Sequence, residues 1–293
     1  MQRVLLATAV LTAVIATPTA SLGAAATSAS HVNSTHSAME LAPLPSSIFD
    51  WNALPAKPTQ VGERRDVADR PTRTLKIFEC HISTLNPGEI SHPPHQHPQE
   101  ELIFLKTGVL EVSINGSTTK VGAGSLFFFA SNDFHNVRNV GDQPATYLVL
   151  NVTTDATATA PKTEAAKSAP ASALRSSVFD WSKAEVKTTK TGARREFFDS
   201  PTVTCANLEC HATTLHAGNA PHAPHHHPDE EFVIVKEGEI EVSAAGQTKR
   251  IGPGSIAFFS SNDEHGIKNT SSEDATYYIL RVVTEKTPKT GRN

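Results

Sequence analysis

The chain repeats itself once, and this duplication constrains its fold more than any other feature. The segment SSIFDW at residues 46–51 recurs as SSVFDW at residues 176–181, and the offset of 130 residues (46 to 176) then holds without a gap to the end of the second copy. Roughly half of the paired positions are identical, far more than shared composition would produce. Because the repeat is too long for a solenoid unit, it indicates two copies of one folded domain.

Within each copy, the apolar residues follow the pattern of short strands. Alternating apolar runs are separated by Gly, Pro, Asn and Asp, and in the first copy they occupy residues 101–106, 110–114, 125–130 and 145–152. No segment of helical period and length lies between them. Each copy is therefore predicted to be a compact all-β sandwich or barrel.

The segments outside the two copies suggest a secreted protein. Arg3, the apolar run at 4–15 and the small residues at 16–26 follow the order of a secretory signal peptide, and the run is too short to span a bilayer. We therefore expect a protein without a membrane span, secreted or periplasmic. The predicted organisation is a signal peptide (1–26), a disordered segment (27–45), domain 1 (46–152), a flexible linker (153–175), domain 2 (176–285) and a C-terminal tail (286–293).

The net charge limits which partners the chain can bind, and the cysteine count limits which disulfide bonds it can form. With a formal net charge of -4, the chain has no excess of basic residues that would attract nucleic acid or an anionic membrane, so a small molecule is the expected partner. Three cysteines cannot all pair within one chain. Cys80 and Cys210 are interpreted as buried free thiols, with a bridge between the domains as the alternative.

A histidine-rich segment in each copy contains the candidate ligands for a metal ion. His95 and His97 are two residues apart, so both rings leave the same face of a strand, and Glu101 opens the next apolar strand. His135 follows a Phe-rich strand and the turn at 131–133. The second copy repeats the set as His225, His227, Glu231 and His265.

Three imidazoles and one carboxylate make a mixed nitrogen and oxygen ligand set. Such a set suits divalent manganese or iron, with nickel, copper or zinc as alternatives, and we expect one ion per domain. Four protein ligands around an octahedral ion leave two positions open, which is typical of a catalytic site and not of a closed structural one.

These residues resemble the two motifs of the cupin superfamily, over residues 46–152 and again over 176–282. The first motif is matched by Gly88, His95, His97, Glu101 and Gly108, and by Gly218, His225, His227, Glu231 and Gly238. The second is matched by Gly124, His135 and Asn139, and by Gly254, His265 and Asn269. One extra residue precedes the first histidine, and Ser125 and Ser255 stand where the family commonly has Asp; these departures leave the ligand positions unchanged.

The resemblance implies two tandem jelly-roll (double-stranded β-helix) barrels with the ligands lining their interiors. It also implies a bicupin distantly similar to oxalate decarboxylases and germin-like proteins, and association into homo-oligomers through outer strands. The function that follows is a secreted metalloenzyme acting on a small organic molecule as an oxygenase, decarboxylase or isomerase. The alternative is a cupin that binds metal or a ligand without turnover; a storage role as in seed globulins ranks last, because those relatives have generally lost the ligand residues.

Several residues near the predicted ligands have more than one interpretation. His92 and His222 are the catalytic candidates, as proton shuttles or as groups behind the ligands, and exposure to solvent is the alternative. Glu100 and Glu230 are expected to be solvated charges on the outer strand face. The pair Glu79–His81, with its counterpart 130 residues later, faces either the barrel interior or the outer sheet surface. The pair Arg64–Arg65, with its counterpart, either binds an anionic substrate or caps the sheet edge with charge.

Overall fold

The structure, a computed structural model, describes residues 41–162, 167 and 169–289. The predicted signal peptide (1–26) lies outside this range, as do residues 27–40, part of the predicted linker and the last four residues. Among the described residues, no helix has the length and apolar character needed to cross a membrane. The all-β prediction is confirmed, because strands form nearly all of the regular structure.

Ten strands come from each repeat. In the first they are β1 (Ser47–Phe49), β2 (Lys57–Pro58), β3 (Gly62–Arg70), β4 (Ile77–Leu85), β5 (Glu100–Thr107), β6 (Val109–Ile114), β7 (Ser117–Gly122), β8 (Leu126–Phe129), β9 (His135–Asn139) and β10 (Ala145–Thr153). In the second they are β11 (Ser177–Phe179), β12 (Lys187–Thr189), β13 (Gly192–Ser200), β14 (Asn207–Leu215), β15 (Glu230–Glu237), β16 (Ile240–Ala244), β17 (Gln247–Ile251), β18 (Ile256–Phe259), β19 (His265–Lys268) and β20 (Ala275–Val283). Short 3-10 turns are η1 (Trp51–Ala53), η2 (Ala156–Thr159) and η3 (Trp181–Lys183).

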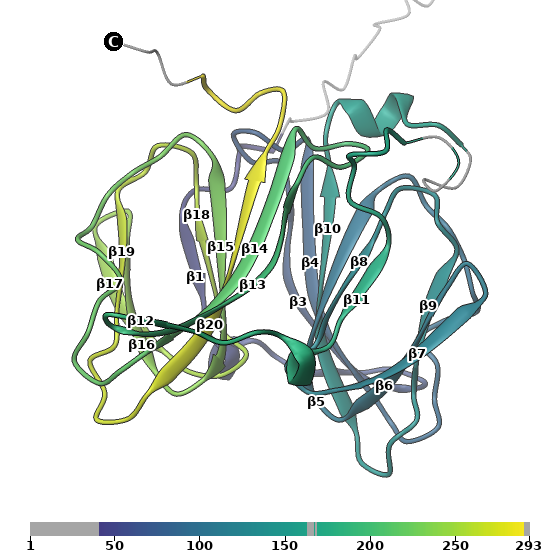
Figure 1. Ribbon diagram of the computed structural model, residues 1–293, viewed down its shortest axis with the longest axis horizontal. Coiled ribbons are helices and arrows are strands. Elements are labelled where there is room, and N and C mark those ends of the chain that lie inside the picture. Colours follow the sequence, from purple (N-terminus) through teal and green to yellow (C-terminus); the bar gives the residue numbers. More distant parts are fainter. Residues whose placement is uncertain (1–40, 163–166, 168, 290–293) are drawn as a thin grey trace, which may run out of the picture. The chain divides into compact units, whose positions relative to one another are not determined.

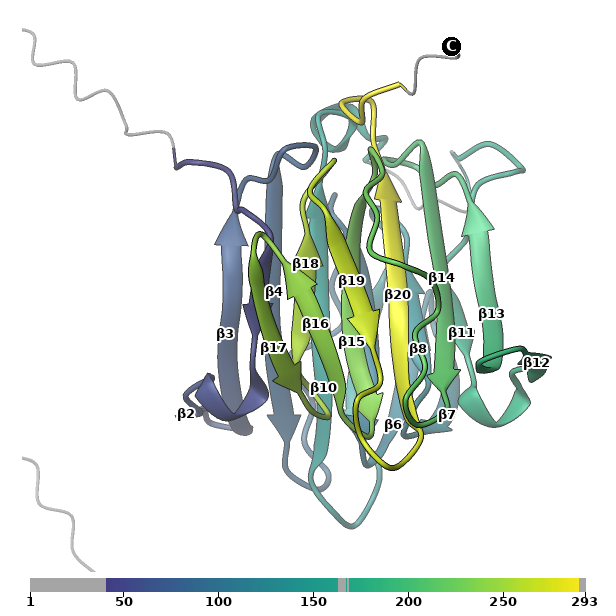
Figure 2. The ribbon, with the colours of Figure 1, turned by 90° about the vertical axis from the view of Figure 1, so that its left-hand side faces the viewer.

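The strands form two seven-stranded and two three-stranded antiparallel sheets. The large sheets have the orders β11-β8-β5-β10-β4-β3-β2 and β1-β18-β15-β20-β14-β13-β12, and the small sheets are β7-β6-β9 and β17-β16-β19. In Figure 1 the two large sheets lie next to each other in the middle, with one small sheet on either outer side. Figure 2 shows β16, β17 and β19 in front of the large sheet that they cover. Each pair of a large and a small sheet is one jelly-roll barrel.

Both faces of each large sheet are buried, which explains the nearly continuous apolar run of β5. One face carries Ile103 and Leu105 into a core inside the barrel. The other face packs against the second barrel in a core shared by both repeats, where the rings of Phe78 and Phe232 lie 4.5 Å apart between centroids and those of Phe104 and Tyr278 lie 5.1 Å apart. The two barrels therefore share their largest apolar core.

The first strand of each repeat joins the sheet of the other repeat. Strand β1 pairs with β18, with Ser47 opposite Phe258, and β11 pairs with β8, with Ser177 opposite Phe128. In Figure 1 the purple β1 lies among the green and yellow strands of the second repeat. This reciprocal exchange adds backbone hydrogen bonds to the shared core and ties the two barrels together.

Glu100 and Glu230 are buried between the barrels, so the expectation that they are solvated charges is wrong. Strand alternation does place Glu100 on the face opposite Glu101, but that face is covered by the other barrel, and Glu100 is fully buried. Its carboxylate accepts hydrogen bonds from the hydroxyls of Thr202 (2.6 Å) and Thr204 (2.7 Å) and from the backbone N–H of Val203 (2.9 Å).

All three cysteines are buried and free, which confirms the interpretation of Cys80 and Cys210 as free thiols. Burial raises the pKa of each thiol, including that of Cys205. These cysteines therefore act as small apolar residues of the shared core, and their thiolates are disfavoured.

Candidate metal centre

Three histidines meet inside each barrel. In the first repeat, one ligand nitrogen from each of His95, His97 and His135 lies within 4.8 Å of the others, and the second repeat has the same group in His225, His227 and His265. His95 and His97 come from the loop before β5, whereas His135 begins β9 on the facing small sheet. The fold thus brings together the histidines that the sequence predicts as ligands.

The backbone fixes these loops before any ligand is considered. His95 and His135 exchange two backbone hydrogen bonds, at 3.1 and 2.9 Å, which form an isolated bridge between the loop and the small sheet. The N–H of Asn132 donates to the carbonyl of His97 at 2.8 Å, and Asn132 itself has a φ of 62°. Asparagine tolerates this left-handed conformation better than most residues, so the Ser131–Asp133 turn holds the loop in place.

The hydrogen bonds of the rings leave nitrogen lone pairs free for a metal ion. The Nδ1–H of His135 donates to the carbonyl of Asp133 at 2.9 Å, and that of His97 donates to the carbonyl of Gln99 at 3.1 Å. These bonds place the proton on Nδ1, so Nε2 carries the lone pair. The Nε2 of His135 is buried without a hydrogen-bond partner among the described residues, as is the Nε2 of His265. Such unpaired nitrogens in a polar group fit a metal ion as the missing partner.

Glu101 adds a carboxylate beside two of the rings. Its oxygens lie 3.4 Å from the Nε2 of His97 and 3.9 Å from that of His135. Burial alone would raise the pKa of Glu101, but its interactions with the rings of His97 and His135 outweigh burial and lower this pKa. Burial lowers the pKa of His135 to about 4, so this ring is neutral at neutral pH, which is the form that binds a metal ion. At His97 the carboxylate of Glu101 outweighs burial and raises the pKa.

Aromatic packing orients the most deeply buried ligand. The ring of Phe129 stacks on that of His135 with centroids 4.2 Å apart and an interplanar angle of 13°, and Phe259 stacks on His265 in the same way. Phe129 and Phe259 are both buried in the cores of their barrels, and each ring also restrains a candidate ligand.

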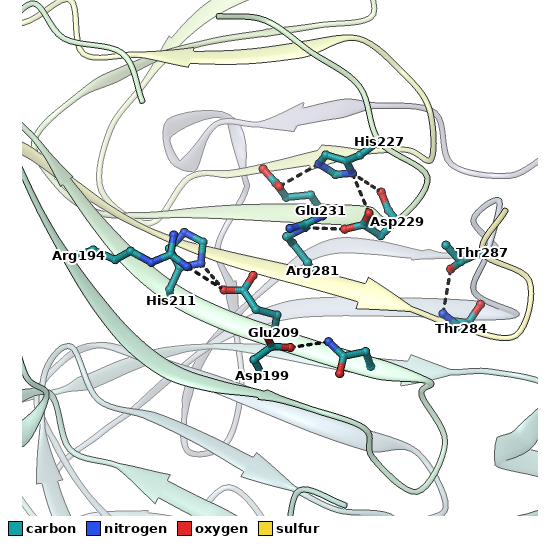
Figure 3. Close-up of polar contacts among 11 residues, drawn as sticks. Arg194, Asp199, Glu209, His211, His227, Asp229, Glu231, Arg281, Thr284 and Thr287 are labelled. Atoms are coloured by element: carbon teal, nitrogen blue, oxygen red, sulfur yellow. Dashed lines mark hydrogen bonds and ion pairs between the residues drawn. The ribbon is translucent and has the colours of Figure 1, made fainter. Parts of the chain in front are cut away.

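The second repeat adds a charged network, shown in Figure 3. The Nδ1–H of His227 faces the backbone carbonyl of Asp229 at 3.0 Å and its carboxylate at 3.2 Å, and Asp229 accepts a hydrogen bond from Arg281 at 2.5 Å. The Nε2 of His227 lies 3.2 Å from Glu231. The carboxylates of Asp229 and Glu231 outweigh burial and raise the pKa of His227 to about 9, so binding of a metal there would release a proton.

A cavity adjoins each histidine group. The cavity of the first barrel, about 210 Å³, is lined by Glu101 and His135 together with His92 and the apolar Ile103. That of the second barrel, about 350 Å³, is lined by the candidate ligands His225, His227 and Glu231 and by His222. His92 and His222 are both exposed to solvent, and the ring of His92 lies 4.2 Å from that of His95. The catalytic candidates His92 and His222 thus lie at the cavities, and their role stays a prediction.

The Glu79–His81 pair faces the barrel interior, and so does Arg64. His81 and Arg64 line the first cavity, and the Nδ1–H of His81 donates to Glu79 at 2.7 Å. Arg64 also donates to Glu79, at 3.0 Å. Arg65, one residue later, points elsewhere: its guanidinium lies 4.6 Å from the ring centre of Trp51. Alternation along β3 therefore separates the two arginines, one to the cavity and one to a cation–π contact.

Sequence reasoning missed Asp229, Arg281 and Tyr147. Tyr147 lines the first cavity from β10, and Arg281 lines the second from β20. The available signal was a difference between the copies: Asp229 replaces Gln99 two residues after a ligand, and Arg281 replaces Asn151 on the strand next to the ligand glutamate.

A family model described as "Cupin domain" matches residues 81–151 and again 212–281. A search of the curated proteins finds no match.

Solved structures share the fold at low sequence identity. The structure of AerE from Microcystis aeruginosa is 16% identical, with a TM-score of 0.58 over 80% of this chain and 99% of that one. A variant of Bacillus subtilis oxalate decarboxylase is 14% identical, with a TM-score of 0.61 over 84% of this chain and 79% of that one. The protein Ylba from E. coli is 10% identical, with a TM-score of 0.63 over 81% and 90%. These similarities establish the architecture of two tandem barrels.

Proposed function

This chain belongs to the cupin superfamily as a bicupin, and we propose that it is a secreted metalloenzyme acting on a small organic molecule. One observation carries the proposal: in each barrel three imidazoles and a carboxylate converge beside a cavity. A divalent ion held by His95, His97, Glu101 and His135, or by their counterparts, would supply a Lewis acid with open positions for substrate. A buried structural site would need no such cavity.

The residues around the ligands favour turnover over binding alone. His81 is oriented by Glu79 through Nδ1, which leaves Nε2 free to give or take a proton at the cavity. Ile103 and Val149 line the same cavity and keep water from part of its wall. Proton transfer beside a polarised oxygen atom is used by oxygenases, decarboxylases and isomerases alike. We therefore propose a reaction of one of these three kinds.

The choice of ion and the location of the protein are parts of the same proposal. Manganese and iron are the first ions to test, because the ligand set suits them and because a solved structure of Bacillus subtilis oxalate decarboxylase, a protein of the same fold, is described by its Mn(II) centres. Secretion is proposed from the sequence of residues 1–26.

Metal content tests the ligand assignment directly. Purified protein without a histidine tag is expected to bind about two equivalents of divalent metal, measured by elemental mass spectrometry, because each barrel offers one open ligand set. His135→Ala or His265→Ala should each remove one equivalent, and the double variant both. His216→Ala is the control, because His216 is exposed and pairs with Asp274 outside the sites. Metal-free protein after anaerobic reconstitution would contradict the assignment.

Turnover separates an enzyme from a binding protein. A panel of small organic acids is screened with the metal-loaded protein, and Glu101→Gln and Glu231→Gln are each introduced alone and together. We expect the double substitution to lower turnover at least tenfold, because it removes the anionic ligand from both sites. Turnover unchanged in the double variant would refute the metalloenzyme, whereas bound metal with no turnover of any acid would favour a metal-binding or ligand-binding cupin.

A further inference from the structure

The two candidate metal sites differ in what holds the second histidine. In the second repeat the Nδ1–H of His227 lies 3.2 Å from the carboxylate of Asp229, in addition to its bond to a backbone carbonyl. In the first repeat the Nδ1–H of His97 reaches only the backbone carbonyl of Gln99, at 3.1 Å. The ligands are the same in both repeats, but only one histidine has a carboxylate behind it.

Arg281 keeps the carboxylate of Asp229 in position. Its Nε donates to Asp229 at 2.5 Å, and Asp229 is 7% exposed, so solvent competes little for this bond. Arg281 lies on β20 between Glu231 and Glu209, the residues opposite it on the two neighbouring strands. Figure 3 shows the resulting series of polar contacts from Glu231 through His227 and Asp229 to Arg281.

The first repeat lacks the residues that form this series of contacts. Asn151 occupies the place of Arg281 opposite Glu101, and its amide donates to Glu79 at 2.9 Å. Gln99 is neutral, so a hydrogen bond from His97 to its side chain would lack the charge of a carboxylate. Two substitutions between the repeats thus remove both the carboxylate and the group that holds it.

We propose that the two metal sites are unequal, and that Asp229, positioned by Arg281, makes the site of the second repeat the tighter one. A carboxylate that accepts the Nδ1–H of a ligand histidine fixes its tautomer and ring orientation and makes Nε2 a stronger donor to the metal. Loss of such a partner typically lowers metal affinity by about 10 to 100-fold. The inference rests on the proposed function only in requiring that both barrels bind metal.

The test uses Mn²⁺ alone as the probe, titrated by calorimetry into metal-free full-length protein. His265→Ala isolates the first site and His135→Ala the second, and we expect the second site to bind at least tenfold more tightly. Asp229→Gln, which copies the first repeat, should abolish most of this difference. Gln99→Asp combined with Asn151→Arg should tighten the first site, a gain that a merely destabilised variant cannot show.

The outcomes separate the two proposals. If neither site binds Mn²⁺, the proposed function fails and the inequality with it. If both sites bind with the same affinity, or if neither the Asp229→Gln loss nor the double-substitution gain is seen, metal binding stands and the role of Asp229 is refuted. Thermal unfolding of each metal-free variant shows which of them are folded and therefore count in the comparison.

Discussion

Glu100→Ala is expected to lower the free energy of unfolding by about 3 to 5 kcal/mol, although Glu100 contributes nothing to the metal site. The substitution removes the acceptor of three hydrogen bonds from the loop of the other repeat. It leaves the hydroxyls of the buried Thr202 and Thr204 and the N–H of the partly buried Val203 without this partner. Glu230→Ala should act in the same way on residues 72–74.

Two comparison variants separate the buried hydrogen bonds from other effects. Burial raises the pKa of Glu100 and outweighs the lowering by its donors, so the neutral form is favoured more than in water. Glu100→Gln keeps the size and one acceptor oxygen and should therefore cost less than the alanine substitution. Glu89→Ala is the control: Glu89 is exposed, and its replacement should change stability by less than about 0.5 kcal/mol.

The measurement is equilibrium denaturation of the metal-free protein, followed by fluorescence and circular dichroism. Since the barrels exchange strands and share their core, we expect one transition that shifts as a whole in both glutamate variants. A Glu100→Ala protein as stable as Glu89→Ala would contradict the role of this hydrogen-bond network. Two separate transitions, only one of which moves, would contradict the coupling of the barrels.

The sequence was sufficient for the architecture and for which histidines meet. The period-two alternation of β5 predicts that Glu101 faces the barrel interior with Ile103 and Leu105, and the structure has them there. The 130-residue offset predicts two such groups, and each forms one cluster. These successes depend on local spacing and on repetition, both of which are visible in a single sequence.

The strand exchange could not be predicted, because the two repeats begin almost identically. Ser47–Phe49 can pair equally well, by its own pattern, with β8 of its own repeat or with β18 of the other. Only the geometry between the barrels decides between these partners. The burial of Glu100 could not be predicted for the same reason: alternation predicts the face on which the side chain lies but not what covers that face.

The role of Asp229 escaped prediction for a different reason. A carboxylate two residues from a ligand histidine can reach its ring, a backbone donor or solvent, and spacing does not distinguish these. The deciding contact comes from Arg281, which is far away in sequence and adjacent only through the register of β15 and β20. Comparison of the two repeats nevertheless marks both positions as places where the sites have diverged.

Gly124→Ala should cost about 2 to 4 kcal/mol of stability, for a reason that also lies between the repeats. Gly124 has a φ of +90°, and a Cβ there would lie 2.8 Å from Cγ of Trp181 and 2.7 Å from Cε of Lys236, both from the other repeat. The lysine chain can move, but the indole is also held by two cation–π contacts, with the charged groups of Lys236 and Arg195 lying 4.5 and 4.2 Å from its ring centre. Gly254 meets Trp51 in the same manner.

Gly116→Ala is a matched control, because Gly116 has a φ of +84° and no atom within 4 Å of the added Cβ. It should cost only the backbone strain, about 1 to 2 kcal/mol, so the difference between the two variants measures the close approach of Trp181. Trp181→Leu in the Gly124→Ala background should cost less than Trp181→Leu alone, since the smaller side chain relieves the overlap. Equal losses of stability in Gly124→Ala and Gly116→Ala would show that the indole of Trp181 moves aside without cost. Gly124 would then be needed for its turn and not for the packing of one barrel on the other.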